Sequence, residues 1–271
     1  MRSRSFWVGL APVLLAPCMP AQSQMPPMGD FSGYERIDRG RVLVQLSEAT
    51  ALAPADFSSK NLSGLDLAGV DFKHANLTAA VMNGADLSGA DLSGCNLTVS
   101  FAERANLQGA KLRGAIMFSM QLAGAKLRGA DLTGARLIGD LQHADLRGAH
   151  MANLDAAADM KNQSMGLMHA VISSADLGGA DLHAADLSRA DLSFSSLAAA
   201  NLRGTRIFGG DFSGTSLAGA DLSGADLRES KFIDTDFSGA DLTDADLSGS
   251  ILRNVRGLDS AKRTGARGLP P

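Results

Sequence analysis

A five-residue period constrains this chain more than any other feature. Positions that step by five from Phe57 to Leu137 are large and apolar at every step except Ala102, and a second run from Leu167 to Leu252 has Leu, Ile or Phe at every step. A unit of five residues is too short to bury its own apolar side chain, so a core can form only when many units stack. The period therefore predicts a solenoid.

The residues between the apolar positions indicate how each unit folds. A small residue stands two places before the Leu, as Ala85 does before Leu87 and Ala180 before Leu182, so both side chains lie on one face of a short extended segment. The next two residues are typically Ser-Gly, Arg-Gly or Thr-Gly. They favour a turn, because Gly adopts positive φ easily and Ser bonds to nearby backbone. A similar turn in every unit predicts coils that stack about 4.8 Å apart.

This motif closely resembles that of the pentapeptide-repeat family, in which Ala, then Asp or Asn, then Leu precede two freer residues. Matching units are Ala85-Asp86-Leu87-Ser88-Gly89, Ala105-Asn106-Leu107-Gln108-Gly109 and Ala220-Asp221-Leu222-Ser223-Gly224. The resemblance spans roughly residues 55–254. It implies an all-β fold, a right-handed quadrilateral β-helix with four units in each coil.

The spacing of the units agrees with such coils. Phe212 and Phe232 are twenty residues apart, as direct stacking of four-unit coils requires. Phe57 and Leu252 are separated by a multiple of five residues, so uninterrupted winding predicts about ten coils and a rod of about 48 Å.

The first residues have the pattern of a secretory signal peptide. Arg2 and Arg4 precede an apolar stretch from Phe6 to Leu15, and Ala21-Gln22-Ser23 is a small-x-small cleavage signal. The apolar stretch is shorter than the about 20 residues that a membrane span needs. We therefore expect a signal peptide over 1–23, cleavage near Ser23, and a periplasmic or secreted protein. A cytoplasmic leader is the alternative.

Cysteine use follows from this expectation. Cleavage near Ser23 would leave Cys95 as a lone thiol, which cannot form an internal disulfide. Cys95 takes the small position two residues before Leu97, so we interpret it as a buried small hydrophobe. A lipoprotein would instead be acylated at Cys18, although Pro17 departs from the small residue that such a site prefers.

The segments on either side of the array are predicted to be a cap and a tail. Residues 24–54 are interpreted as a linker followed by an N-terminal cap of strand and short helix, because an open β-helix end exposes unpaired strand edges. Residues 255–271 are polar and basic, with Gly and Pro, and are predicted to form a flexible C-terminal tail.

The array is irregular over 138–166. Leu141 follows Leu137 one residue early, and the motif is lost between Met151 and Leu167. The stretch from Asn153 to Lys161 has an N-cap candidate followed by good helix formers. It is predicted either to bulge outward as a loop or helical turn or to be a simple irregularity. In relatives of the gyrase-protecting type a protruding loop carries function. The resemblance therefore implies that a bulge in this stretch would be a candidate functional element.

Soft metal ligands gather in the same region. They are His143, His150, Met151, Met160, Met165, Met168 and His169. Imidazole and thioether ligands suit copper in an exported protein, but the spacing follows no known site, and Met also fills gaps in an irregular core. We interpret the cluster as gap filling and keep a periplasmic copper-binding protein as an alternative.

Acidic residues are unevenly distributed. Residues 55–137 carry seven acids and eight bases, whereas 165–254 carry thirteen acids and six bases. In a four-sided coil six of these acids share two neighbouring walls, and they form the candidate interaction surface: Asp181, Asp221 and Asp241 on one wall, Asp186, Asp226 and Asp246 on the next. Regular carboxylates can imitate duplex DNA, as in family members that bind DNA gyrase. The plainer interpretation is that Asp before Leu favours the turn and solubility.

The sequence lacks the signatures of catalysis. We find no Gly-x-Ser-x-Gly elbow, phosphate loop, metalloprotease helix motif or paired Cys site. The acids recur at outward positions where burial cannot tune their pKa, and no basic stripe with stacking aromatics suggests nucleic-acid binding.

We therefore expect a non-enzymatic chain without cofactor, metal, small-molecule substrate, nucleic-acid partner or membrane span. It is predicted to be an exported rod that binds a protein or serves as a scaffold. The alternatives are a cytoplasmic DNA mimic that binds DNA gyrase and the copper-binding protein. The sequence leaves open whether two copies pair through their flat walls.

Overall fold

The elements of this computed structural model are short strands and one helix, and residues 31–50, 52–72, 74–158 and 169–270 are described. The chain divides into two units, 1–33 and 34–271. Only the turn at 31–33 is described in the first, so the expected signal peptide lies outside the described residues. The second unit contains β1 (Glu35–Arg36), α1 (Arg39–Glu48), β2 (Lys60–Asn61), β3 (Ile116–Gln121), β4 (Arg136–Asp140), β5 (Lys231–Ile233) and β6 (Ile251–Arg253). The pairs β1–β2, β3–β4 and β5–β6 are parallel.

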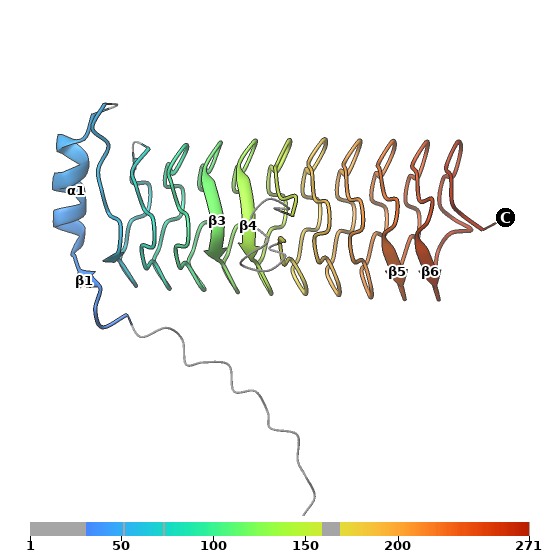
Figure 1. Ribbon diagram of the computed structural model, residues 1–271, viewed down its shortest axis with the longest axis horizontal. Coiled ribbons are helices and arrows are strands. Elements are labelled where there is room, and N and C mark those ends of the chain that lie inside the picture. Colours follow the sequence, from blue (N-terminus) through green and yellow to red (C-terminus); the bar gives the residue numbers. More distant parts are fainter. Residues whose placement is uncertain (1–30, 51, 73, 159–168, 271) are drawn as a thin grey trace, which may run out of the picture. The chain divides into compact units, whose positions relative to one another are not determined.

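Parallel backbone bridges join each coil of the second unit to the next (Figure 1). Among the described residues these bridges form four ladders, which we name by their first members: the Asp56, Asn61, Asp66 and Asp71 ladders. Along the regular parts of a ladder each residue pairs with the one twenty positions later, as Asp86 does with Asn106. The winding therefore repeats after four pentapeptides, and the Asp or Asn position of each unit makes the bridge.

The large and small apolar positions of the pentapeptides face inward. Leu222 is completely buried and Ala220 nearly so, and the same holds along the array. Phe212 stacks on Phe232 with ring centroids 4.9 Å apart, and Phe232 lies 5.3 Å from Phe237. Full burial of one such side chain contributes roughly 1.5–3 kcal/mol. The prediction that the five-residue period marks the core is confirmed.

Almost every described pentapeptide turns at a residue with positive φ, and in many of them the preceding Asp supports the turn. Gly219 and Gly224 have φ of 67° and 66°, a conformation that Gly adopts without steric cost. The backbone N–H of Ser223 donates a 2.9 Å hydrogen bond to Oδ1 of Asp221. The same bond between an Asp and the second residue after it recurs along the array, for example from Ser188 to Asp186 at 3.0 Å. The Asp of the motif is therefore a structural residue first.

A strand and a helix lie at the N-terminal end of the second unit (Figure 1). β1 pairs with β2 through Glu35 and Lys60, and α1 begins after Asp38, whose side chain accepts a 2.8 Å hydrogen bond from the N–H of Arg41. Val42 and Leu46 of α1 are buried against the core of the first coil. The ten residues of α1 are far too few for a membrane span, and no other described helix could cross one.

One coil in the middle of the array is a residue short. Ile138 pairs with Phe118 and Gly139 pairs with Met120, so Ser119 bulges out of β3. A Cβ atom at Gly139 would overlap the carbonyl oxygen of Met120, so this close approach requires Gly. The early Leu141 of the sequence is the consequence of this bulge.

The next coil contains an insertion. Asp140 pairs with Val171 and Asp155 pairs with Asp186, thirty-one residues later instead of twenty. The four ladders continue through the stretch that the sequence predicted to be irregular, with one coil of nineteen residues followed by one of thirty-one. The predicted outward bulge is wrong for Asn153 to Ala158, because Asp155 bridges both neighbouring coils. Residues 159–161 lie outside the described part of the chain.

Two exchanged side chains hide the motif just before the insertion. Leu154 takes the inner position that is usually small, and Ala156 takes the position that is usually Leu; both are buried. The exchange keeps the total volume of the pair while it reverses the order, and close packing tolerates such volume-conserving changes best.

The C-terminal residues 255–270 continue the ladders, so the prediction of a flexible tail differs from the structure. Arg256, Lys262 and Arg267 bridge to Asp236, Asp241 and Asp246 of the preceding coil. The basic side chains face aspartates: Nζ of Lys262 lies 3.0 Å from Oδ2 of Asp241. One extra residue between Arg256 and Lys262 breaks the five-residue period, which is why the sequence pattern ended too early.

Candidate interaction surface

The six candidate aspartates fall in two ladders that follow each other along the chain. Asp181, Asp221 and Asp241 belong to the Asp71 ladder. The Asp56 ladder contains the other three, Asp186, Asp226 and Asp246. All six are half-buried at bridge positions. The structure thus brings each trio onto one face.

Neither trio forms an unbroken row of carboxylates. Asn201 lies between Asp181 and Asp221, and its Nδ2 donates a 2.9 Å hydrogen bond to Oδ1 of Asp181. Arg206 lies between Asp186 and Asp226, and its Nη1 is 3.2 Å from Oδ2 of Asp186. Within these two stretches an acid therefore often meets a donor from the next coil.

Other donors on the same faces lower the pKa values of the aspartates. Nε of Arg228 lies 2.7 Å from Oδ1 of Asp226, and the hydrogen bond from this guanidinium lowers the pKa of Asp226. Hydrogen bonds from Thr243, joined by Lys262, lower the pKa of Asp241 to about 2. These carboxylates are ionised at neutral pH, but their charge is already largely matched.

Asp181 has a histidine partner in the same turn. Nδ1 of His183 lies 2.8 Å from Oδ1 of Asp181, and the backbone N–H of His183 donates to the same oxygen at 3.3 Å. Burial raises the pKa of Asp181, but the hydrogen bonds from His183 outweigh it, so the net change is downward. This carboxylate too is engaged within the chain.

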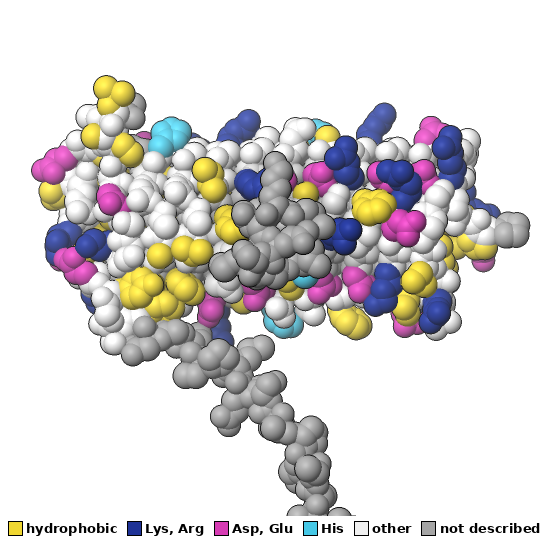
Figure 2. Space-filling model, viewed as in Figure 1, with side chains coloured by type: hydrophobic (Ala, Val, Ile, Leu, Met, Phe, Trp, Pro, Cys, Tyr) yellow, Lys and Arg dark blue, Asp and Glu magenta, His cyan; other side chains and the backbone are white. Residues whose placement is uncertain are grey.

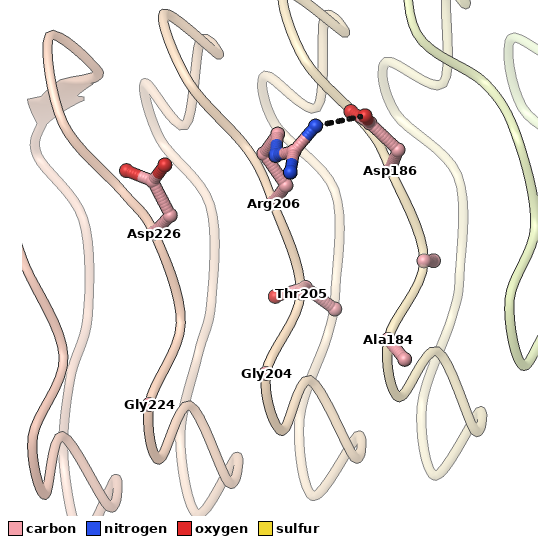
Figure 3. Close-up of a pocket in the computed structure, with 8 residues that line it drawn as sticks. Ala184, Asp186, Gly204, Thr205, Arg206, Gly224 and Asp226 are labelled. Atoms are coloured by element: carbon pink, nitrogen blue, oxygen red, sulfur yellow. Dashed lines mark hydrogen bonds and ion pairs between the residues drawn. The ribbon is translucent and has the colours of Figure 1, made fainter.

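A shallow hollow of about 420 Å³ lies along the Asp56 ladder (Figure 3). Asp186, Arg206 and Asp226 line one side of it, and Gly204 and Gly224 form the corner on the other. The Arg206 guanidinium turns toward Asp186 and away from Asp226. Because the corner residues have almost no side chain, the floor is largely backbone, which suits contact with a flat surface.

The described members of the His/Met cluster do not converge on one site. His143 lies at a corner after the Asn61 ladder, His150 belongs to the Asp71 ladder, and Met151 is buried inside. The remaining members are His169, which is half-buried before Val171, and Met160, Met165 and Met168, which lie outside the described residues. In the part of the chain that the structure describes, no group of three His, Cys, Asp or Glu could hold a metal ion.

Cys95 occupies the inner small position, as the sequence predicted. The side chain is free and fully buried. Burial raises the pKa of its thiol to about 12. The thiol is therefore protonated and unreactive, and the interpretation as a small hydrophobe is confirmed.

Sequence reasoning missed a second outward feature, a set of large apolar residues around the Asn61 ladder. The ladder contains Phe101, Val171 and Ile251, which are half-buried or exposed, and Val81, which is buried. Across the described bridges of the other three ladders, Ile116 of the Asp56 ladder is the only large apolar residue. The space-filling view likewise shows hydrophobic side chains gathered in patches between the charged ones (Figure 2). Steps of twenty residues join Val81 with Phe101 and Val171 with Ile251, but the short coil and the insertion offset the two pairs, so the sequence pattern hides the set.

The sequence model of the family described as pentapeptide repeats matches this chain in eight copies, which lie in residues 61–98, 121–153, 167–204, 175–214 and 211–249. Similar solved structures include HetL, a pentapeptide repeat protein involved in heterocyst differentiation regulation from the cyanobacterium Nostoc sp. strain PCC 7120. It is 28% identical, with 85% of this chain and 96% of HetL covered and a TM-score of 0.29.

Two further solved structures are similar to this chain. Rfr23 from the cyanobacterium Cyanothece 51142 is 21% identical, with 45% of this chain and 90% of that chain covered and a TM-score of 0.41. Full-length QnrB1, a plasmid-mediated fluoroquinolone resistance protein, is 18% identical, with 86% and 88% covered and a TM-score of 0.35. No curated protein matches the chain. Because the matched repeats span more than half of its length, the chain belongs to the pentapeptide-repeat family, whose members form right-handed β-helices.

Proposed function

We propose that this chain is an exported, non-enzymatic rod that binds another protein through its flat outer faces or holds it as a scaffold. One observation carries the proposal: inward positions such as Leu222 are completely buried along the array, so only the outward positions can make specific contacts. A stack of equal coils keeps these positions on a rigid, regular grid while their side chains vary.

The proposal includes a quadrilateral cross-section and about ten coils. Four ladders within each twenty residues support the four sides, and the Asp56 ladder has ten successive pairings from Asp56 to Arg267. With coils about 4.8 Å apart, this is a rod of about 48 Å. Such a length offers a partner several coils of contact.

Binding without catalysis agrees with the polar groups of the surface. The aspartates that repeat outward, such as Asp221 and Asp226, are bonded to their own turns. Members of the pentapeptide-repeat family are generally structural or binding proteins. Export rests on the pattern of Arg2, Arg4, the apolar stretch and the cleavage signal at Ala21-Gln22-Ser23.

The two alternatives have less support. DNA mimicry needs an extended run of free carboxylates, whereas Arg206 and Asn201 interrupt the two trios and Lys262 pairs with Asp241. Copper binding needs converging ligands, whereas His143, His150 and the buried Met151 lie at different positions of the coil. We therefore propose neither function.

The test combines cell fractionation and N-terminal sequencing with photo-crosslinking in the compartment that contains the chain. Photoreactive residues are placed one at a time at outward positions on each side of the coil, such as Ser213 and Ser223. At least one of them should link the rod to one defined protein, and a mature N-terminus should lie near Gln24. A full-length cytoplasmic chain would overturn export. Failure of outward positions on all four sides to crosslink any protein would overturn the binding role.

A further inference from the structure

We infer that the docking surface is the face centred on the Asn61 ladder, and that its partner is a protein segment presenting apolar side chains together with lysine or arginine. We call this surface the Asn61 face; it comprises the described residues of the Asn61 ladder and of the two corners beside it. The inference rests on the proposed function and deepens it, because it assigns one face and the chemistry of the partner.

The first argument is the placement of exposed apolar side chains. Phe194, Val99 and Ile251 belong to the Asn61 face and are 71%, 40% and 49% exposed. Ile116, which is 46% exposed, precedes one of its corners. By contrast, the described residues of the Asp66 and Asp71 ladders include no large apolar side chain. Apolar groups concentrated on one face of a regular solenoid mark an interaction site.

The second argument is the backbone under two of these side chains. Val99 and Phe194 sit at corners with φ of 51° and 58°, where a β-branched or bulky residue is an outlier and Gly is favoured. The Phe194 ring lies over Gly214 of the next coil, since a Cβ there would come within 2.6 Å of the ring. A strained backbone that presents an exposed apolar side chain serves contact with a partner better than it serves the fold.

The third argument is charge. Asp140 and Asp191 lie in the Asn61 ladder, and neither forms an ion pair with any described residue. Oδ1 of Asp191 accepts a 2.9 Å hydrogen bond from the N–H of Ser193 and leaves its charge unmatched. Asp211 in the same ladder pairs with Lys231 at 2.9 Å. At the corners of the face Glu229 and Asp234 balance Arg104 and Arg189, so the two ladder carboxylates leave the face with a net negative charge. A negative face with apolar side chains is complementary to a cationic, apolar segment, and such complementarity steers association.

The test uses the full chain and synthetic peptides of equal length. The probe alternates leucine with lysine; one control peptide replaces lysine by glutamate and another replaces leucine by serine. Binding is followed by fluorescence anisotropy at several salt concentrations. We expect the leucine-lysine peptide to bind and the two control peptides to bind at least about tenfold more weakly, because each lacks one of the two complementary features.

Four variants locate the site on the rod. Phe194→Gly removes the ring and relieves the corner, so the fold is preserved; Ala199→Gly makes the same change at a corner with φ of 54° beyond the Asp66 ladder. Asp191→Asn removes a charge, but the Asn side chain can still accept the hydrogen bond from the N–H of Ser193. Asp221→Asn makes the same change on the Asp71 ladder, where the N–H of Ser223 donates at 2.9 Å.

We expect Phe194→Gly to weaken binding of the leucine-lysine peptide about tenfold or more. Asp191→Asn should weaken binding of the leucine-lysine peptide several-fold and reduce the salt dependence of its affinity. The control variants Ala199→Gly and Asp221→Asn should change this affinity less than about twofold.

Each other outcome overturns the inference. If Phe194→Gly and Ala199→Gly change the peptide affinity equally, or if the two Asn variants do, the peptide does not bind at the Asn61 face. A rod that is dimeric by sedimentation and becomes monomeric with Phe194→Gly would make a second copy the occupant. If the crosslinking described above captures a partner and Phe194→Gly leaves that capture unchanged, the proposed binding role is kept. The assignment of the docking surface to the Asn61 face is then wrong.

Discussion

The Asp71 ladder and the Asn61 ladder share one interior but present different exteriors. Asp221 in the Asp71 ladder is followed by Leu222, and Asp211 in the Asn61 ladder is followed by Phe212. Both of these apolar side chains are fully buried. Outward, most aspartates of the Asp71 ladder pair with a basic side chain, as Asp241 does with Lys262. The Asn61 ladder instead mixes apolar residues with carboxylates, such as that of Asp191, that form no ion pair with a described residue. The backbone makes the bridges, so the outward side chain can vary while the winding is kept.

The largest difference between interior and exterior should appear in stability. Leu222→Ala removes a fully buried side chain and should lower the free energy of unfolding by about 2–5 kcal/mol. Asp221→Ala, one residue earlier, removes the bond to Ser223 and should cost about 1 kcal/mol. Urea unfolding of the two variants and the wild type gives the comparison. Similar losses for both would mean that the exterior, too, determines the fold.

The Asn61 face also contains the close backbone contact at the shortened coil. Gly139→Ala places a methyl group against the carbonyl of Met120 and should destabilise the protein by about 3 kcal/mol. Gly219→Ala beyond the Asp66 ladder, with φ of 67° and open space around it, should cost only the strain of positive φ, about 1 kcal/mol. Thermal unfolding separates the two cases, and a smaller effect at 139 than at 219 would contradict the bulge at Ser119.

Acid should weaken the polar faces through their engaged aspartates. The pKa of Asp241 is lowered to about 2 in the folded state, below an unfolded value of about 3.9. Its stabilisation is therefore present above about pH 4 and is lost as the pH falls toward about 2. We expect unfolding midpoints to drop over this range, and Asp241→Asn to reduce the drop while it lowers stability at neutral pH. An unchanged acid response in this variant would rule out the contribution.

The sequence predicted the interior well because burial imposes the same requirement on every unit. Leu222 and Ala220 could be placed from the period alone, and the family resemblance added the twenty-residue coil. Three features escaped because they depend on contacts between coils: the approach of Gly139 to Met120, the exchange of Leu154 with Ala156, and the continued winding beyond residue 255. The basic residues of the last coil, which face aspartates twenty or twenty-one positions earlier, were a signal that the period concealed.

The candidate surface was only partly accessible to sequence reasoning. The two aspartate trios could be grouped because they repeat at multiples of twenty residues. Their engagement could not be foreseen, since it depends on which atoms the turns and the next coil offer, as Arg206 does to Asp186. The Asn61 face was missed because its apolar residues occur at bridges and at corners, and no single five-residue position contains them all.

The smallest expected change in stability gives the most direct test of the central claim, which is that the exposed apolar residues of the Asn61 face serve a partner and not the fold. Phe194→Gly should leave the unfolding temperature unchanged or raise it, because Gly relieves the positive φ of 58°, with a gain of up to about 1 kcal/mol. In the same preparation its affinity for the leucine-lysine peptide should fall about tenfold or more. A lower unfolding temperature with undiminished affinity would show that the ring stabilises the coil, and would contradict the account.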